Sequence, residues 1–588
     1  MLKECKLNNP RTSISKYFRM FVRILTQNVQ RLTNNDMENS FIKLIEESIK
    51  NNWELNALTD YKGITLRYKD VARKVAKMHI MLEEGGIRPG DKVAVCGRNS
   101  AHWVVAFLGV ITYGAVAVPI LHEFKPDNIH HIVNHSEARM LFAGDQVWEN
   151  LNEACMPGLE AIVLLTDFSL LVSRSERISE ARERLNELFG HRFPRNFRPE
   201  HVAYRRDLPE ELAIINYTSG TTGYSKGVML PYRSILSNVM LCRERIDLRP
   251  GDSVVSMLPL GHVFGMVFDF LFGVCQGAHL WFLTRMPSPK IIASSFAEIR
   301  PRVISSVPLV VEKIFKKMIL PRVDTKLGRF LLKVPIVSDK IKMKAREEAM
   351  QVFGGNFIEI IIGGAPFNAE VEAFLRLIDF PYTIAYGMTE CGPIICHNFW
   401  TNLKYTSCGQ VVPRMELKID SPVPHSVPGE LLCRGENLML GYYKNPEATS
   451  QVIDPQGWLH TGDMAVMDDE GHVFIKGRCK NMLLTASGQN IYPEEIESKL
   501  NNMLYVSESI VILHHDKLVA LVYPDWSELG DAGHDPGRVE ALMDDCRRQL
   551  NGQLPAYAQI SRIKVWPEEF EKTAKKSIKR YLYQDVRL

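Results

Sequence analysis

The sequence of 588 residues has no C-x-x-C pair among its eleven cysteines. The closest two, Cys391 and Cys396, have no histidine pair at zinc spacing beside them, so the pattern does not indicate a metal–thiolate site. An odd number of scattered cysteines in a large chain is typical of reduced, buried thiols, and we expect a cytoplasmic protein. The net charge is only +3, which is too small to indicate a nucleic-acid partner.

The sequence also has no internal repeat, no low-complexity tract and no G-x-G-x-x-G fingerprint for a dinucleotide. Apolar residues make up 46% of the chain and charged residues 24%, which is the balance of a soluble globular protein. The chain is too long for one ordinary domain, and it is long enough to bury a large core.

One apolar run approaches the length that would cross a membrane. Residues 103–121, WVVAFLGVITYGAVAVPIL, carry no charge, and a spanning helix needs about 20 apolar residues. Gly109, Gly114 and Pro119 interrupt the run, and its second half is rich in β-branched residues. We therefore expect a buried helix followed by a buried strand rather than a membrane-spanning helix.

The first 36 residues carry seven Lys or Arg against Glu4 and Asp36. Their segment ISKYFRMFVRILTQNVQRL is basic and amphipathic, a pattern typical of helices that lie on a membrane surface. It has no long apolar core and no small-residue cleavage site, so it is not a secretory signal. Met37 offers a second start, and residues 1–36 are either an extension that contacts a membrane surface or a non-native addition.

Predicted helices and strands alternate along most of the chain. This alternation predicts an α/β fold, in which layered subdomains enclose buried and largely parallel sheets. After about residue 478 the pattern restarts as a smaller α+β unit, with Pro493 at the start of a helix. We predict a large N-terminal domain over residues 37–478 and a small C-terminal domain over residues 479–588. Strands are expected at 213–217, 279–283, 302–307 and 357–364, and helices at 69–86, 287–300 and 367–378.

Residues 218–228, TSGTTGYSKGV, follow an apolar strand and are rich in small donors. Glycines let backbone N–H groups converge on an anion, hydroxyls add donors, and Lys226 adds a full positive charge. The P-loop pattern G-x-x-x-x-G-K-[ST] is not matched, because position 225 is serine. Taken alone, the stretch is either a phosphate-binding loop or a flexible surface turn. The candidate phosphate ligands are Thr218, Ser219, Gly220, Thr221, Thr222, Gly223 and Lys226.

The stretch resembles the phosphate loop of the adenylate-forming superfamily, which includes acyl-CoA synthetases, luciferase-like enzymes and peptide-synthetase adenylation domains. Five further stretches follow in the order of that family: LPLGHVFGM at 258–266, GGAPF at 363–367, AYGMTECGP at 385–393, GWLHTGDMAVMDDEGHVFIKGR at 457–478 and SGQNIYPEEIE at 487–497. The resemblance covers roughly residues 40–588. It implies a large layered N-terminal domain, a small mobile C-terminal domain, and a reaction in which a carboxylate takes AMP from ATP while pyrophosphate leaves.

The resemblance also implies which residues hold the nucleoside. Tyr386 is similar to the aromatic residue that stacks on adenine, and the GGAP turn is similar to the backbone wall opposite. Asp463 and Arg478 match the two residues that contact the ribose hydroxyls. The implied nucleoside-binding residues are Gly364, Ala365, Pro366, Tyr386, Gly387, Met388, Asp463 and Arg478.

Further roles are implied by the same motifs. Thr389 matches the residue that offers a hydroxyl to the α-phosphate, and Glu390 matches a ligand of Mg²⁺, a hard cation that prefers oxygen. His262 lies where members of the family place a residue near the acyl carboxylate. Lys480 corresponds to the hinge on which the C-terminal domain turns, and Gly488 belongs to the loop that lines the path of the thiol.

One motif departs from the family. Members carry a lysine in a T-G-K-I-K-R pattern, and that lysine binds both the carboxylate and the α-phosphate during adenylation. In FEKTAKKSIKRYLY, at 570–583, alignment on IKR places Ser577 at the position of this lysine. We favour Lys576, which a one-residue bulge would bring into the site. The alternative is that adenylation is impaired and the basic residues form a solvated face.

The acid is expected to be a fatty acid. Residues 304–318, ISSVPLVVEKIFKKM, look most like long- and medium-chain fatty acyl-CoA synthetases. Residues 231–240 lack the acid with which peptide-synthetase domains read amino acids, and the apolar stretch 265–283 fits either an alkyl channel or plain core. We therefore expect a fatty acyl-CoA ligase that uses ATP, Mg²⁺ and CoA. Two alternatives remain open for the function: an acyl-carrier protein as the acceptor, or a catalytically weak AMP-binding regulatory module. A homodimer and peripheral contact with the inner face of the membrane also remain open.

Overall fold

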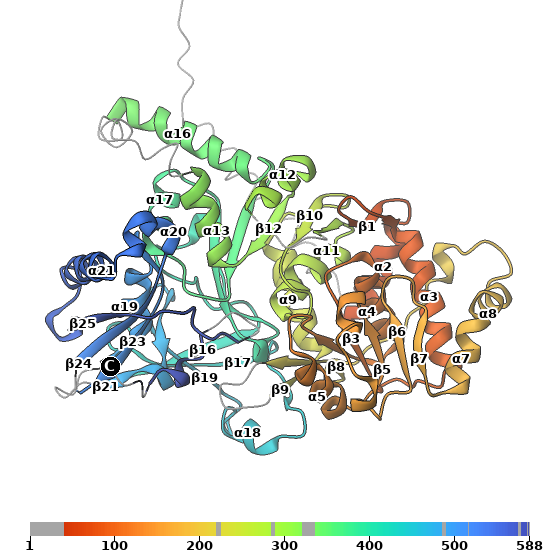
Figure 1. Ribbon diagram of the computed structural model, residues 1–588. Helices are drawn as coiled ribbons and strands as arrows, with labels where there is room; N and C mark the ends of the chain where they lie inside the picture. The colour runs from red at the N-terminus through yellow and green to blue at the C-terminus, as the bar shows by residue number, and fades with distance from the viewer. Residues whose placement is uncertain are drawn as a thin grey trace, which may run out of the picture.

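The computed structural model describes residues 40–218, 225–283, 289–319, 335–484, 490–515, 517–573, 578–584 and 586. Within these residues the strands form two eight-stranded sheets, a four-stranded sheet, a three-stranded sheet and a two-stranded ribbon. The two large sheets and the helices around them occupy most of the molecule, and the C-terminal elements, drawn in blue, lie at one end (Figure 1). The predicted N-terminal extension, residues 1–36, lies outside the described residues.

The first large sheet leads directly into the predicted phosphate loop. Its order is β18-β9-β8-β4-β3-β5-β6-β7. The central strands are parallel, whereas β7, β9 and β18 join in antiparallel fashion at the edges. The strands are β3 Lys92–Cys96, β4 Val116–Ile120, β5 Ala138–Ala143, β6 Ala161–Leu164, β7 Leu170–Ser173, β8 Leu212–Thr218, β9 Lys226–Pro231 and β18 Gly441–Tyr442.

The second large sheet carries the other nucleotide motifs at its strand ends. Its order is β15-β14-β13-β12-β10-β11-β1-β2, with parallel pairing everywhere except at β2 and β15. Every residue of β13 is buried, as expected for a parallel strand covered on both faces. The strands are β1 Asn56–Asp60, β2 Thr65–Arg67, β10 Ser253–Ser256, β11 His279–Phe282, β12 Val303–Ser306, β13 Glu359–Gly363, β14 Tyr382–Gly387 and β15 Ile394–Cys396.

The long apolar run folds as predicted, into helix α4 (Ala101–Tyr113) and strand β4. Ser100 caps the helix, since its hydroxyl accepts a hydrogen bond from the Trp103 amide, 3.1 Å away. Gly114 ends it in the left-handed region, with φ 94°. Among the described residues, no helix has both the length and the apolar character needed to cross a membrane.

Helices cover the sheets and separate them (Figure 1). In Figure 1, α16 (Pro335–Val352) lies along the outside of the molecule beside α12 (Pro289–Ile299). The helices expected at 69–86, 287–300 and 367–378 are present as α3 Tyr68–Glu84, α12 and α17 Ala369–Leu377. The remaining helices of the large part are α2 Phe41–Asn51, α5 Pro126–Ser136, α6 Asp145–Trp148, α7 Glu176–Glu183, α8 Leu185–Arg192, α9 Tyr232–Arg245, α10 Val263–Gly265, α11 Phe272–Cys275, α13 Pro308–Ile314 and α18 Pro446–Ser450.

A four-stranded antiparallel sheet links the large part to the C-terminal unit. Its order is β16-β17-β19-β20. The hairpin between β19 and β20 turns at residues 468–471, where Gly471 has φ 81°, a conformation that favours glycine. The strands are β16 Met415–Asp420, β17 Gly429–Gly435, β19 Leu459–Met467 and β20 Val473–Arg478.

The C-terminal unit is α+β and has a hydrophobic core of its own. Helix α19 (Pro493–Leu500) begins at Pro493 as predicted, because proline at the first helical position needs no N–H partner. The other elements are β21 Leu483–Leu484, β22 Asn490–Ile491, β23 Val506–His514, β24 Lys517–Pro524, β25 Arg562–Val565, α20 Trp526–Leu529 and α21 Pro536–Asn551. The fold is therefore a large α/β part followed by a smaller α+β part, and the exact boundary near residue 478 stays a prediction.

Candidate functional site

Thr218 and Lys226 face each other at the loop end of the β8–β9 hairpin. β8 is buried along most of its length, so its end is held firmly by the sheet. The connection between the two strands is the predicted phosphate loop, of which Ser219, Gly220, Thr221, Thr222 and Gly223 lie outside the described residues. The hairpin thus places one hydroxyl and one ammonium group at the two ends of that loop.

Asp463 stands in direct contact with two other predicted residues. It pairs in register with Arg478 across β19 and β20, and its Oδ1 lies 2.8 Å from Arg478 Nε. Its Oδ2 accepts a hydrogen bond of 2.5 Å from Tyr386 Oη. The residue is 4% exposed, and this burial raises the pKa of the carboxyl, whereas the Arg478 guanidinium and the Tyr386 hydroxyl oppose the rise. Residues of two separate motifs therefore form one cluster.

Glu390 and Thr389 lie in a single 3-10 turn, η5 Thr389–Cys391, shortly after β14. Both are buried, and Glu390 is 8% exposed. Glu390 Oε1 accepts a hydrogen bond of 2.8 Å from Tyr442 Oη. Oε2 accepts none from the part of the chain that the structure describes. One carboxylate oxygen is thus oriented by the protein, and the other is left for a ligand.

A site with a single carboxylate is better suited to Mg²⁺ that arrives with a nucleotide than to a metal ion bound by protein ligands alone. In the described ranges, no group of three or more His, Cys, Asp or Glu could hold a metal ion. Mg²⁺ is usually held by one or two carboxylates together with substrate phosphates. Glu390 therefore has the chemistry for a Mg²⁺ ion that arrives with a nucleotide.

The GGAP turn and the YGM segment leave neighbouring strands. β13 and β14 are adjacent and parallel, so residues 364–366 and 387–388 follow the same edge of the sheet. Gly364 has φ 91°, a left-handed conformation that favours glycine. A Cβ on Gly387 would lie 2.0 Å from the carbonyl oxygen of Pro393, so only glycine fits there. Gly364, Ala365 and Pro366 are exposed, which leaves their backbone open to a ligand.

His262 lies beside the strand that leads into the phosphate loop. It caps α10, with its Nδ1 accepting a hydrogen bond of 3.3 Å from the Phe264 amide. Asn216, on β8, donates a hydrogen bond of 2.8 Å to the carbonyl oxygen of Gly261. α10 continues into a buried π-helix, η3 Met266–Leu271. The segment that leads into the apolar stretch 265–283, predicted as channel or core, is thus hydrogen-bonded to β8 through Asn216. No motif in the sequence pointed to Asn216.

Asp269 is a second residue that the sequence analysis missed. It lies in η3 and is fully buried, and its Oδ2 accepts hydrogen bonds of 3.0 Å from the amides of Met257 and Leu258. Burial raises its pKa to about 7 despite these hydrogen bonds. The signal in the sequence is a lone acid within an otherwise apolar run.

The predicted hinge, Lys480, lies in the short 3-10 helix η7 Cys479–Asn481. Asn481 Nδ2 donates a hydrogen bond of 2.6 Å to Glu494 Oε1 on α19. Gly488, predicted on the CoA side, lies outside the described residues. The chain around Lys480 is therefore tied to the first helix of the C-terminal unit.

The described residues on the two sides of the displaced lysine contact each other. A β-bridge joins Lys572 and Ile578, and Lys579 Nζ lies 2.9 Å from Glu571 Oε2. Lys575, Lys576 and Ser577 lie outside the described residues, so the choice of Lys576 stays a prediction. Lys579 is held in an ion pair.

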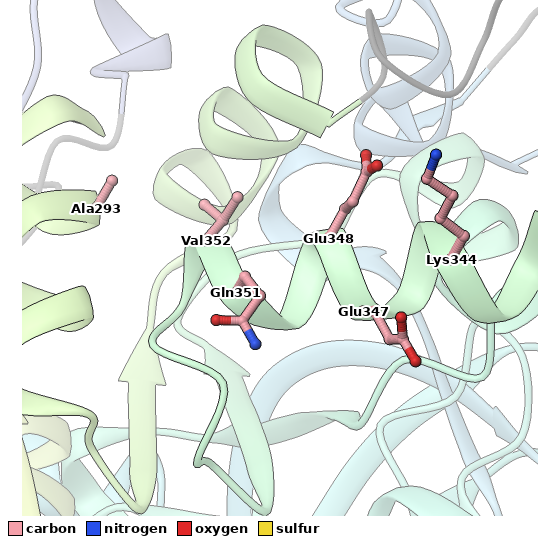
Figure 2. Close-up of a pocket in the computed structure, with 6 residues that line it drawn as sticks. All are labelled: Ala293, Lys344, Glu347, Glu348, Gln351 and Val352. Carbon is pink, nitrogen blue, oxygen red and sulfur yellow. The ribbon is translucent and has the colours of Figure 1, made fainter.

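The pocket in Figure 2, of about 670 Å³, lies elsewhere, between α12 and α16. In Figure 2 the side chains of Lys344 and Glu348 point to one side of α16, and that of Glu347 points to the other. None of the predicted site residues lines it. Its lining residues are Ala293, Lys344, Glu347, Glu348, Gln351 and Val352.

Residues 45–443 match the family model of the AMP-binding enzyme. This match covers more than half of the chain, and the chain therefore belongs to the AMP-binding enzyme family. The resemblance to adenylate-forming enzymes that the six motifs indicated is thereby confirmed.

Several curated relatives align over most of the chain. A long-chain-fatty-acid–CoA ligase of Escherichia coli O6:H1 is 28% identical over 557 residues, which cover 88% of this chain and 90% of the relative. The human long-chain-fatty-acid–CoA ligase 1 is 27% identical over 558 residues, covering 86% and 78% of the two chains.

Solved structures share the fold. An anthranilate CoA ligase in complex with anthranoyl-AMP superposes with a TM-score of 0.75 at 21% identity, covering 94% of this chain and 97% of the other. ATP-bound MatB from Rhodopseudomonas palustris gives a TM-score of 0.73 at 20% identity, with 93% and 99% covered. These likenesses confirm the predicted architecture.

Proposed function

We propose that this protein is a fatty acyl-CoA ligase of the AMP-forming acid–thiol type. In the first step a carboxylate oxygen of the fatty acid attacks the α-phosphorus of ATP, and pyrophosphate leaves. In the second step the sulfur of CoA attacks the acyl carbon, and AMP leaves. The observation that carries the proposal is the contact of Tyr386, Asp463 and Arg478, which joins the residues implied to hold adenine with those implied to hold ribose.

The nucleoside would lie against this cluster. Asp463 has carboxylate oxygens that can accept hydrogen bonds from ribose hydroxyls, and Arg478 supplies donors beside it. The Tyr386 hydroxyl bond to Asp463 fixes the orientation of the ring, and the exposed backbone at 364–366 offers the opposite wall. Two solved structures with the same fold support this placement. One contains ATP, and the other contains an acyl adenylate.

The phosphates would lie between the β8–β9 hairpin and the η5 turn. Lys226, Thr218 and the loop between them would bind the pyrophosphate end, and Thr389 the α-phosphate. Mg²⁺, when bound at Glu390, would neutralise charge on the phosphate oxygens. Preorganised donors at the α-phosphorus stabilise the charge that develops there and supply much of the rate enhancement.

The fatty acid and CoA are supported by the names of the relatives and by the apolar surroundings of His262. In this proposal His262 lies near the acyl carboxylate, and the π-helix η3 borders the alkyl chain. The domains over 37–478 and 479–588 turn about Lys480 between the two steps, and the loop with Gly488 lines the path of CoA. A cytoplasmic location, membrane contact by residues 1–36 and a homodimer stay predictions.

Pyrophosphate release across a panel of free acids, with and without CoA, tests the proposal. We expect release with fatty acids, and acyl-CoA as the product only when CoA is present. Release without any CoA product, but with an acylated carrier protein, would instead support a carrier-loading enzyme. Ser577 at the lysine position gives a specific reason to test a third outcome, in which ATP binds but no acid releases pyrophosphate, as in a regulatory module.

A further inference from the structure

Tyr442 contacts two candidate site residues that come from different motifs. Its hydroxyl donates a hydrogen bond of 2.8 Å to Glu390 Oε1. The centroid of its ring lies 4.8 Å from Lys226 Nζ, within the range of a cation–π interaction. The residue is 7% exposed. One side chain therefore touches both the candidate metal ligand and the candidate phosphate lysine.

The backbone holds Tyr442 in this position from two sides. β18 pairs with β9, where Tyr442 is in register with Val228, and the Tyr443 amide donates to the carbonyl oxygen of Gly227 over 2.7 Å. Just before β18, the Met439 amide donates to the carbonyl oxygen of Glu390 over 2.8 Å. The segment is thus attached to the strand of Lys226 and to the turn of Glu390.

The bond to Glu390 uses the proton of the Tyr442 hydroxyl, with the carboxylate oxygen as the acceptor. With Oε1 engaged in this way, Glu390 has a fixed orientation and presents Oε2 to a cation. The ring of Tyr442, in turn, offers its electron-rich face to Lys226.

We propose that Tyr442 is a positioning residue that couples Mg²⁺ binding at Glu390 to phosphate binding at Lys226. This inference rests on the proposed function, because it assumes that the site binds MgATP. A rigid link between the two groups lowers the cost of ordering them when the nucleotide arrives. Mg²⁺ and ATP should therefore strengthen each other's binding through this side chain.

The test is ATP binding by calorimetry over a series of Mg²⁺ concentrations, without any acid. Tyr442→Phe keeps the ring but removes the hydroxyl. We expect it to raise the Mg²⁺ concentration for half-maximal tightening of ATP binding about tenfold, the value of one hydrogen bond to a charged group. Its affinity for ATP without Mg²⁺ should change little. Tyr442→Leu should in addition weaken ATP binding without Mg²⁺ by roughly threefold, through loss of the cation–π contact.

Tyr443→Phe is the matched control. Its hydroxyl also donates to a glutamate, Glu137, at 2.9 Å, but that residue lies outside the candidate site. We expect wild-type Mg²⁺ dependence from this variant. In a Glu390→Gln background, Tyr442→Phe should have no further effect on the Mg²⁺ dependence.

The possible outcomes distinguish the inference from the proposed function. Normal Mg²⁺ dependence in Tyr442→Phe, or an equal shift in Tyr443→Phe, would overturn the coupling role alone. No ATP binding by the wild-type protein would overturn both. ATP binding without pyrophosphate release would count against the ligase, while the coupling would still be decided by the binding data.

Discussion

The buried carboxylates Asp269, Glu359 and Asp463 show how the surroundings of one residue decide its chemistry. Burial raises the pKa of all three. Asp463 has Arg478 at 2.8 Å, which favours its charged form. At Oδ2, Asp269 accepts hydrogen bonds from two backbone amides, and its pKa rises to about 7. Asp463 is thus suited to accept hydrogen bonds, whereas Asp269 is suited to hold a proton within an apolar helix.

Asp269 should make stability depend on pH. Folding raises the pKa of this carboxyl from 3.8 to about 7, so between these values the native protein binds a proton that the unfolded chain has lost. Stability therefore falls as the pH rises through this window, by at most about 4 kcal/mol from this group. Asp269→Asn removes the titration. We expect its Tm relative to wild type to rise between pH 4 and 7 and then to level off, as measured by thermal unfolding.

Asp531→Asn is a suitable control, because Asp531 is exposed. Its Tm difference from wild type should stay constant across the same pH range. A constant difference for Asp269→Asn as well would mean that Asp269 does not hold an extra proton in the native protein.

At the scale of elements, strand pairing places two of the candidate lysines. The β8–β9 hairpin holds Lys226 at a strand end, and an isolated bridge joins Lys572 to Ile578, the residue before Lys579. Beside this bridge, Lys579 forms an ion pair with Glu571. To bind the α-phosphate, Lys579 would have to exchange this exposed partner for another anion.

We predict that Lys576→Ala slows adenylation about a hundredfold, since a preorganised donor at the developing charge is typically worth about 3 kcal/mol. Lys575→Ala and Lys579→Ala should change the rate little, because neighbouring side chains of an extended loop point to opposite sides. The measurement is single-turnover pyrophosphate release. Transfer of the acyl group to CoA from supplied acyl-adenylate should survive in all three variants.

Ser577→Lys restores the residue of the family pattern. It should speed adenylation if the native arrangement is a compromise. Normal adenylation rates in all three alanine variants would show that another group carries the charge.

At the scale of the whole molecule, the C-terminal unit rests on the large part through polar contacts. Lys476 Nζ, on β20, lies 3.2 Å from Glu495 Oε1 on α19, and Asn368, at the start of α17, donates to Asn502 Oδ1. Lys579 lowers the pKa of Glu571 most, and the charge of Lys125 in the large part adds to this effect. Exposed ion pairs are weak, and contacts of this kind can break when a domain turns.

Lys480→Pro should therefore separate the two half-reactions. Proline fixes φ near −65°, so it would block rotation at the hinge while leaving the present arrangement in place. We expect acyl-adenylate formation within about threefold of wild type and acyl transfer to CoA slowed at least tenfold. Rapid-quench measurement of both half-reactions checks this. Lys480→Ala is the control, and equal loss of both steps in the proline variant would point to a different pivot.

Much of the fold was predictable because its signals are local. The apolar stretches at 213–217 and 357–364 became β8 and β13, and the charge-free run became α4 and β4. Glycine and proline marked helix ends at Gly114 and Pro493. The hairpin between β19 and β20 by itself sets which residues of its two strands stand opposite, as for Asp463 and Arg478.

The sequence by itself therefore determined the family, the order of the motifs and the residue types at the candidate site. Only the tertiary structure decided how the motifs meet. Tyr442 is 52 residues from Glu390, and no periodicity relates it to Glu390 or to Lys226. Their contact depends on an edge strand pairing with β9, and such pairing is set by long-range hydrogen bonds and burial that only the folded chain creates.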